Sequence, residues 1–173
     1  ACAAQKDTVS DPYAKGQGVE LFAQAEKLFE AQAYEEALQL YLEYMERYKE
    51  EPLAAAALMK IGSIHAVRGD FENARAAYRR ILSDYPTSSF EQDAQVASLF
   101  TYYQQRRYQD VIQLAPTILQ RLDSNLHIFK TYALMGDTYM ALDAPIDALN
   151  YYVRAREYAT ELEQDAILGK FKE

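Results

Sequence analysis

Four short segments of this sequence recur at a constant interval, and that interval restricts what the chain can fold into. The segments are 34–41, 71–78, 108–115 and 145–152. Their fourth places are 37 residues apart and hold a small or β-branched residue in each case: Ala37, Ala74, Val111 and Ala148. An aromatic residue opens three of the four segments. Equal spacing of this length indicates a stack of similar structural units.

The composition assigns these units to the all-α class. Only 6 glycines and 5 prolines occur among 173 residues, too few for the frequent turns of a sheet-rich domain. Long stretches are rich in good helix formers. We therefore expect two helices per unit, at roughly 17–32, 34–50, 53–68, 71–84, 89–105, 107–122, 125–142 and 144–160, and a ninth at about 161–172 that caps the last apolar edge.

Helix-capping residues agree with this frame. Asp70 can cap the helix that begins at Phe71, and Ser88 with Glu91 reads as a capping box. Pro145 is tolerated in the first turn of a helix.

A second set of positions repeats with the same period. Twelve residues before the fourth places lie Ala25, Gly62, Leu99 and Gly136. A glycine inside a helix costs about 1 kcal/mol relative to alanine, so its presence there needs a reason. Close approach of the paired helix is that reason, with Ala25, Gly62 and Gly136 facing Ala37, Ala74 and Ala148.

The third unit departs from the pattern. It has Leu99 where a small residue is expected, Val111 opposite, and Pro116 within the second helix. Proline removes a backbone hydrogen bond and crowds the preceding turn. We expect a kink or break there and a wider spacing between the two helices.

These residues resemble the consensus of tetratricopeptide (TPR) repeats, in which a Gly or Ala on the first helix packs against an Ala on the second, followed by an aromatic and a closing Pro. Gly62, Ala74, Tyr78 and Pro86 match that pattern. The resemblance covers roughly residues 17 to 160. It implies an α-α superhelix of four hairpins (17–52, 53–88, 89–124 and 125–160) with a C-terminal capping helix (161–173), after a flexible leader (1–16).

Nothing in the sequence suggests catalysis, a cofactor or a metal. The net charge is −8 and no Lys/Arg cluster offers a face for nucleic acid. Two histidines and one cysteine give no metal-ligand spacing. We interpret His65 as semi-buried beside Gly62 and His127 as a surface residue. No nucleophile and base can be paired, so we expect a protein that is not an enzyme.

The resemblance implies a binding groove along the first helices. Three columns of residues, counted from the Gly/Ala position, are expected to face it: Phe22, Met59, Val96 and Ala133; Glu26, Ser63, Phe100 and Asp137; and Phe29, Ala66, Tyr103 and Met140. A trough of this apolar character suits an apolar or amphipathic peptide or a partner helix. The alternative is that the leader, the ninth helix or another copy of the protein fills it.

Cys2 is the single cysteine, so the chain forms no internal disulfide. Its place before a short polar segment resembles a mature bacterial lipoprotein, in which this cysteine carries lipid and the leader acts as a tether. The long period and early cysteine are similar to Gram-negative cell-envelope TPR lipoproteins: penicillin-binding-protein activators, and TPR proteins of the β-barrel assembly and Tol–Pal systems. This implies a periplasmic, lipid-anchored scaffold for a protein partner. The same reading allows the protein to associate with itself. The alternatives are a soluble cytoplasmic TPR adaptor or assembly factor and, from another class, a helical-repeat hydrolase or transferase.

Overall fold

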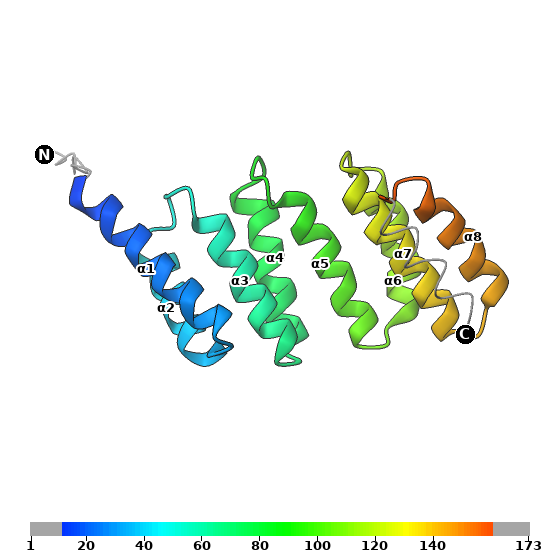
Figure 1. The fold of residues 1–173 in the computed structure, drawn as a ribbon, viewed down its shortest axis with the longest axis horizontal. Coiled ribbons are helices and arrows are strands. Elements are labelled where there is room, and N and C mark those ends of the chain that lie inside the picture. The colour runs from blue at the N-terminus through cyan, green and yellow to red at the C-terminus, as the bar shows by residue number, and fades with distance from the viewer. Residues whose placement is uncertain (1–11, 161–173) are drawn as a thin grey trace, which may run out of the picture.

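The computed structural model describes residues 12–160, and this part of the chain forms eight helices and no strand. The helices are α1 (Pro12–Glu30), α2 (Tyr34–Arg47), α3 (Ala54–Val67), α4 (Phe71–Asp84), α5 (Glu91–Gln104), α6 (Tyr108–Leu119), α7 (Asn125–Ala141) and α8 (Pro145–Arg156). They form four consecutive hairpins that stand side by side in one row (Figure 1). The prediction of an all-α helical repeat is confirmed.

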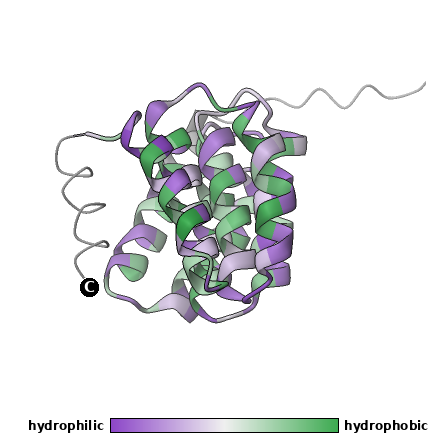
Figure 2. Ribbon diagram, turned by 90° about the vertical axis from the view of Figure 1, so that its right-hand side faces the viewer, coloured by the Kyte–Doolittle hydropathy of each residue, from purple (hydrophilic) through white to green (hydrophobic). Residues whose placement is uncertain are grey.

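The hairpins build two layers. The first helices α1, α3, α5 and α7 make one layer, the second helices α2, α4 and α6 lie behind them, and α8 lies beside α7 at the end of the row (Figure 1). Each helix packs against the next one along the chain, and α5 also contacts α7 directly. Seen along the row, hydrophobic and hydrophilic residues alternate along the helices (Figure 2), as expected when one face of each helix is buried.

Some helix bounds differ from the prediction. Helix α1 begins at Pro12, so the end of the predicted leader is helical. Proline at a first helical position gives up no intrahelical hydrogen bond, which makes this start favourable. Helices α6 and α8 end at Leu119 and Arg156, earlier than expected. Cys2 and the predicted ninth helix at 161–172 lie outside the described residues.

One of the two predicted helix caps is confirmed. The Asp70 carboxylate accepts a hydrogen bond from the backbone N–H of Asn73 at 3.4 Å, and it also lies 3.1 Å from Nδ1 of His65. The predicted capping box is wrong. Helix α5 begins at Glu91, and the Ser88 hydroxyl instead accepts from the backbone N–H of Phe90 at 3.1 Å, within the preceding turn.

A tyrosine ring explains the glycines inside the first helices. A Cβ atom added to Gly62 would lie 2.3 Å from Cε1 of Tyr78, and one added to Gly136 would lie 2.5 Å from Cε1 of Tyr152. Real Cβ atoms do not approach carbon so closely, and both rings are buried. The tyrosine rings are therefore the nearest neighbours that a side chain at these glycines would meet, and Ala74 and Ala148 are fully buried on the same second helices.

The third hairpin exchanges the sizes of the two partners. Leu99 replaces the glycine and Ala115 replaces the tyrosine, and both belong to one buried cluster with Val111. Helix α6 continues through Pro116 to Leu119, so the predicted break does not occur. Helices α5 and α6 contact each other less extensively than the helices of the other hairpins, in agreement with the wider spacing expected for this pair.

A buried arginine joins the second hairpin to the third. Arg75 on α4 is 4% exposed. Its guanidinium donates to the Thr101 hydroxyl at 2.9 Å and to Oε1 of Gln105 at 2.8 Å, and it pairs with Glu72. It also lies over the ring of Tyr102, 4.4 Å from the centroid. Because this buried cation has hydrogen-bond, ion-pair and aromatic partners on both helices, it fixes how α5 packs on α4.

Candidate binding groove

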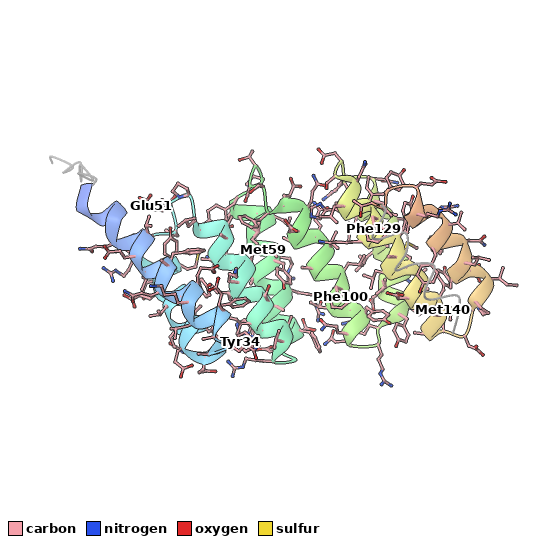
Figure 3. The ribbon with its side chains drawn as sticks, in the orientation of Figure 1. Tyr34, Glu51, Met59, Phe100, Phe129 and Met140 are labelled. Atoms are coloured by element: carbon pink, nitrogen blue, oxygen red, sulfur yellow. The ribbon has the colours of Figure 1, made fainter. Side chains whose placement is uncertain are left out.

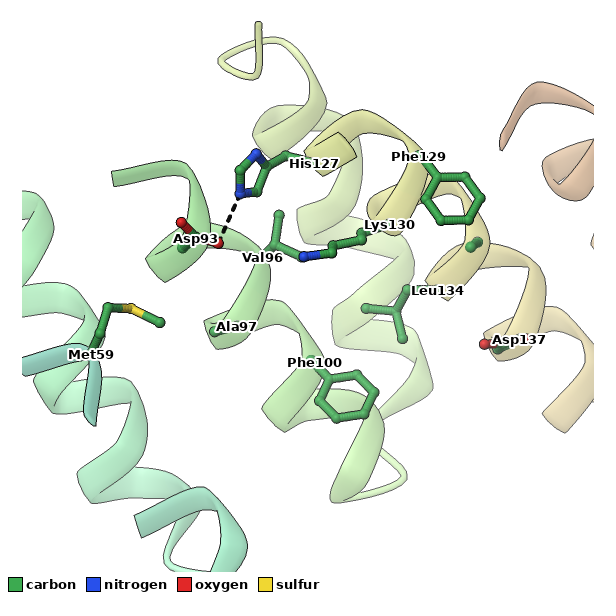
Figure 4. A pocket seen from close by; sticks show the side chains of 11 residues that line it. Met59, Asp93, Val96, Ala97, Phe100, His127, Phe129, Lys130, Leu134 and Asp137 are labelled. Carbon is green, nitrogen blue, oxygen red and sulfur yellow. Dashed lines mark hydrogen bonds and ion pairs between the residues drawn. The ribbon is translucent and has the colours of Figure 1, made fainter. Parts of the chain in front are cut away.

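A hollow with an apolar floor lies on the layer of first helices, where α3, α5 and α7 pass one another (Figure 4). Its volume is about 360 Å³. It is lined by Met59, Asp93, Val96, Ala97, Phe100, His127, Phe129, Lys130, Ala133, Leu134 and Asp137. We call it the α5 groove. Figure 3 shows Met59, Phe100 and Met140 at successive places along this layer.

Five of the residues expected to face the groove line it: Met59, Val96, Phe100, Ala133 and Asp137. The predicted residues of the first hairpin are placed differently. Phe22 packs edge-on against the rings of Tyr41 and Tyr44, at centroid distances of 5.6 and 5.7 Å. It therefore serves mainly to close the first hairpin.

The other predicted residues also lie outside the groove. Phe29 packs against the ring of Tyr34 at 5.6 Å and beneath the ammonium of Lys60 at 4.4 Å. Glu26 pairs with Lys60 at 2.8 Å, and the Ser63 hydroxyl donates to the backbone carbonyl of its own helix. Tyr103 stacks on Phe100 at 6.0 Å, and Met140 is 49% exposed.

Buried tyrosines of the second helices form hydrogen bonds to the acidic residues of the second predicted column, Glu26 and Asp137. The Tyr41 hydroxyl donates to Glu26, and the Tyr152 hydroxyl donates to Asp137 at 2.5 Å. Tyr78 occupies the same repeat position in the second hairpin. Burial, followed by the hydrogen bonds to the carboxylates, raises the pKa of both Tyr41 and Tyr152. The hydroxyls stay protonated, and they orient these side chains from within the core.

The third hairpin, which carries most of the groove floor, lacks such a tyrosine. Ala115 stands where the other hairpins have Tyr41, Tyr78 and Tyr152. No hydroxyl is therefore available there for a polar residue, and the corresponding place holds Phe100, which is 45% exposed. The same size exchange that fits Leu99 into the core thus leaves an apolar ring on the surface of the first-helix layer.

The upper rim of the groove is polar. Nε2 of His127 lies 3.0 Å from Oδ1 of Asp93 (Figure 4). The His127 side chain is 12% exposed and its Nδ1 is buried without a hydrogen-bond partner, so the expectation of a surface histidine is wrong. His65 is half-buried, as predicted, and its Nδ1 lies 3.1 Å from a carboxylate oxygen of Asp70.

Sequence reasoning missed several groove residues that the period contains. Asp93 and Lys130 share one repeat position, and Ala97 and Leu134 share another. Extending the column analysis one turn toward the start of each first helix would have found both pairs. Phe129 has no aromatic counterpart in the other hairpins, so no repeated signal marked it.

The described residues offer little for other chemistry. No group of three or more metal-ligating side chains occurs among residues 12–160. Within the same residues, no helix has the length and apolar character needed to span a membrane.

The fold is that of a TPR-like helical repeat of the all-α class. The fold resembles a solved structure described as "MamA RS-1 ArsTM double mutant", of a TPR-containing protein. The TM-score is 0.63 and the sequence identity 17%, over 82% of this chain and 75% of that one. Likeness at this identity shows the fold alone. No protein-family model and no curated protein sequence matches the chain.

Proposed function

We propose that this protein is a non-catalytic scaffold that binds a peptide or helix of a protein partner in the α5 groove. The observation that carries the proposal is the half-exposed Phe100 above an apolar floor formed by Val96, Ala97 and Leu134. Apolar hollows of this size commonly receive large side chains of a ligand. Burial of one aromatic side chain there would supply a substantial part of the binding free energy.

The shape of the groove favours a peptide or helix over a small metabolite. Its walls come from three helices that run side by side, and it is open along the layer. An amphipathic helix or extended segment can lay one apolar face along such a surface. The polar rim at Asp93, Lys130 and Asp137 would then contact the partner's flanking residues.

Residence in the cell envelope is the second part of the proposal. Its support is the lone Cys2 near the start of the sequence and the similarity of the repeat pattern to envelope TPR lipoproteins. Under this proposal Cys2 carries lipid and the protein works in the periplasm. A cytoplasmic TPR adaptor is the second candidate, and the groove serves it equally well.

Peptide selection tests the groove. A displayed library of random twelve-residue peptides is selected on the wild-type protein, and the chosen peptides are titrated against Phe100→Ser. We expect binding to fall at least tenfold, because the apolar contact at the centre of the site is lost. Ile146→Ser, at a 77% exposed position on α8, is the matched control and should bind normally. Equal binding by Phe100→Ser and the wild type would rule the groove out.

Lipid attachment is tested by expressing the gene with its natural upstream codons in a Gram-negative host with radiolabelled palmitate. Label should enter the wild-type protein and be absent from Cys2→Ala. An unlabelled wild-type protein recovered from the cytoplasm would favour the adaptor.

A further inference from the structure

We infer that the segment bound in the α5 groove carries a lysine or arginine beside its apolar anchor. This rests on the proposed function and specifies its partner. The lining contains two carboxylates, Asp93 and Asp137, and a single lysine. The whole chain has 26 acidic and 18 basic residues. Both the groove and the protein around it therefore attract a cationic segment.

Asp137 is positioned by the core. Its Oδ1 accepts the hydroxyl of Tyr152 at 2.5 Å, and Tyr152 is buried against Gly136, where no side chain lies between ring and helix. The carboxylate is thus held at the edge of the apolar floor and loses little conformational freedom on binding. A pre-organised acceptor of this kind suits a charge-assisted hydrogen bond from a partner cation.

Asp93 is positioned in a comparable way on the other side. Nε2 of His127 lies 3.0 Å from its Oδ1, and the imidazole is largely buried. In Figure 4, Asp93 and Asp137 lie on opposite sides of the groove, with Val96 and Leu134 between them. A partner can therefore place one apolar side chain on the floor and a cation on either side of it.

Two basic side chains near the groove oppose this arrangement only in part. Lys60 is already paired with Glu26 at 2.8 Å and lies over the ring of Phe29. Lys130 extends across the apolar floor and forms no hydrogen bond or ion pair with any other residue of the described range 12–160 (Figure 4). Its ammonium lies where a partner's cation would approach, so its removal should strengthen binding of a basic segment.

The test uses the same displayed library. It records the amino-acid composition of the selected peptides and the change in their affinity when charged groove residues are replaced. Selected peptides should combine a Phe, Leu or Met with an adjacent Lys or Arg. Asp137→Asn keeps an acceptor for Tyr152 and should weaken their binding about threefold to fivefold, as expected for loss of a partly exposed ion pair. Lys130→Gln should tighten binding by about twofold or more, and added salt should weaken wild-type binding.

The outcomes separate this inference from the proposed function. Peptides with Asp or Glu beside the anchor, or charge effects of the opposite sign, would overturn the cationic partner while leaving the groove in place. Peptides whose affinity is unchanged in all the charge variants but is lost in Phe100→Ser would also overturn the cationic partner and leave the groove in place. Peptides insensitive to Phe100→Ser would remove the proposed function and this inference together. Exposed Lys27→Gln, on α1, is the control for a general change of charge.

Discussion

The size exchange between Gly62–Tyr78 and Leu99–Ala115 predicts that two destabilising substitutions should partly compensate each other when they are combined. Both pairs occupy the same two positions of the repeat, and both are buried. Replacing Gly62 by Leu and Tyr78 by Ala would give the second hairpin the pair that the third one already has.

The magnitudes follow from the packing. A Cβ at Gly62 would lie 2.3 Å from Cε1 of Tyr78, about 1.2 Å inside an ordinary carbon contact. Gly62→Ala therefore costs ~1–3 kcal/mol of overpacking, offset by ~1 kcal/mol of helix propensity. Gly62→Leu should cost more than ~3 kcal/mol, and Tyr78→Ala ~3–5 kcal/mol by leaving a cavity. In the double variant the leucine fills the space that the ring vacates, so the coupling energy should reach ~2–3 kcal/mol.

Urea unfolding followed by helical circular dichroism measures the three variants beside the wild type. The double variant should be clearly more stable than the sum of the single losses allows. Strict additivity would refute the idea that ring and glycine occupy one shared space. The pair Gly136 and Tyr152 provides an independent repetition of the cycle.

Three further predictions concern the core and the helix junctions. Because burial raises the pKa of Tyr41 and Tyr152, the folded state keeps protons that the unfolded chain loses near pH ~10. The stability that these groups contribute should be complete below that pH and fall as the pH rises through it. Tyrosinate absorbance of these two rings should appear only as helix is lost, and their ionisation in the intact fold would contradict the prediction. Arg75→Ala should lower the free energy of unfolding by ~2–3 kcal/mol because Thr101 and Gln105 lose a buried charged partner, whereas the exposed neighbour Arg79→Ala should change it by less than ~0.5 kcal/mol. Asp70→Ala should cost ~1 kcal/mol by removing the α4 cap, and Asp70→Asn should restore most of it; a thermal melt that ranks the two variants equally would argue against the cap.

Much of the fold could be predicted because each hairpin's position could be checked against the positions of the other three. A constant interval placed every hairpin, and Asp70 marked one helix start correctly. The start of α1 was missed because residues 12–16 precede the first repeat and show no periodic pattern. The sequence predicted a close approach at the glycines but did not identify the tyrosine rings as the nearest neighbours. Sequence spacing shows that something lies close to Gly62, but the direction of the Tyr78 ring decides what it is.

The candidate site was harder to predict than the fold. The columns included Met59, Val96 and Phe100, which line the α5 groove, since repeat register fixes which side of a helix they occupy. They could not show that Phe22 would be taken up by the first hairpin, because aromatic packing depends on how two helices approach each other. The burial of His127 depends on its contact with Asp93, which comes from the neighbouring first helix.

The account depends most directly on where a selected peptide touches the folded protein. Nuclear magnetic resonance of methyl groups, recorded while the peptide is titrated, answers this without any substitution. We predict that the methyl signals of Met59, Val96 and Leu134 shift together and saturate at the affinity measured for the peptide. Shifts confined to Ile146 and Val153, on the exposed outer side of α8, would place binding elsewhere and contradict the α5 groove as the binding surface.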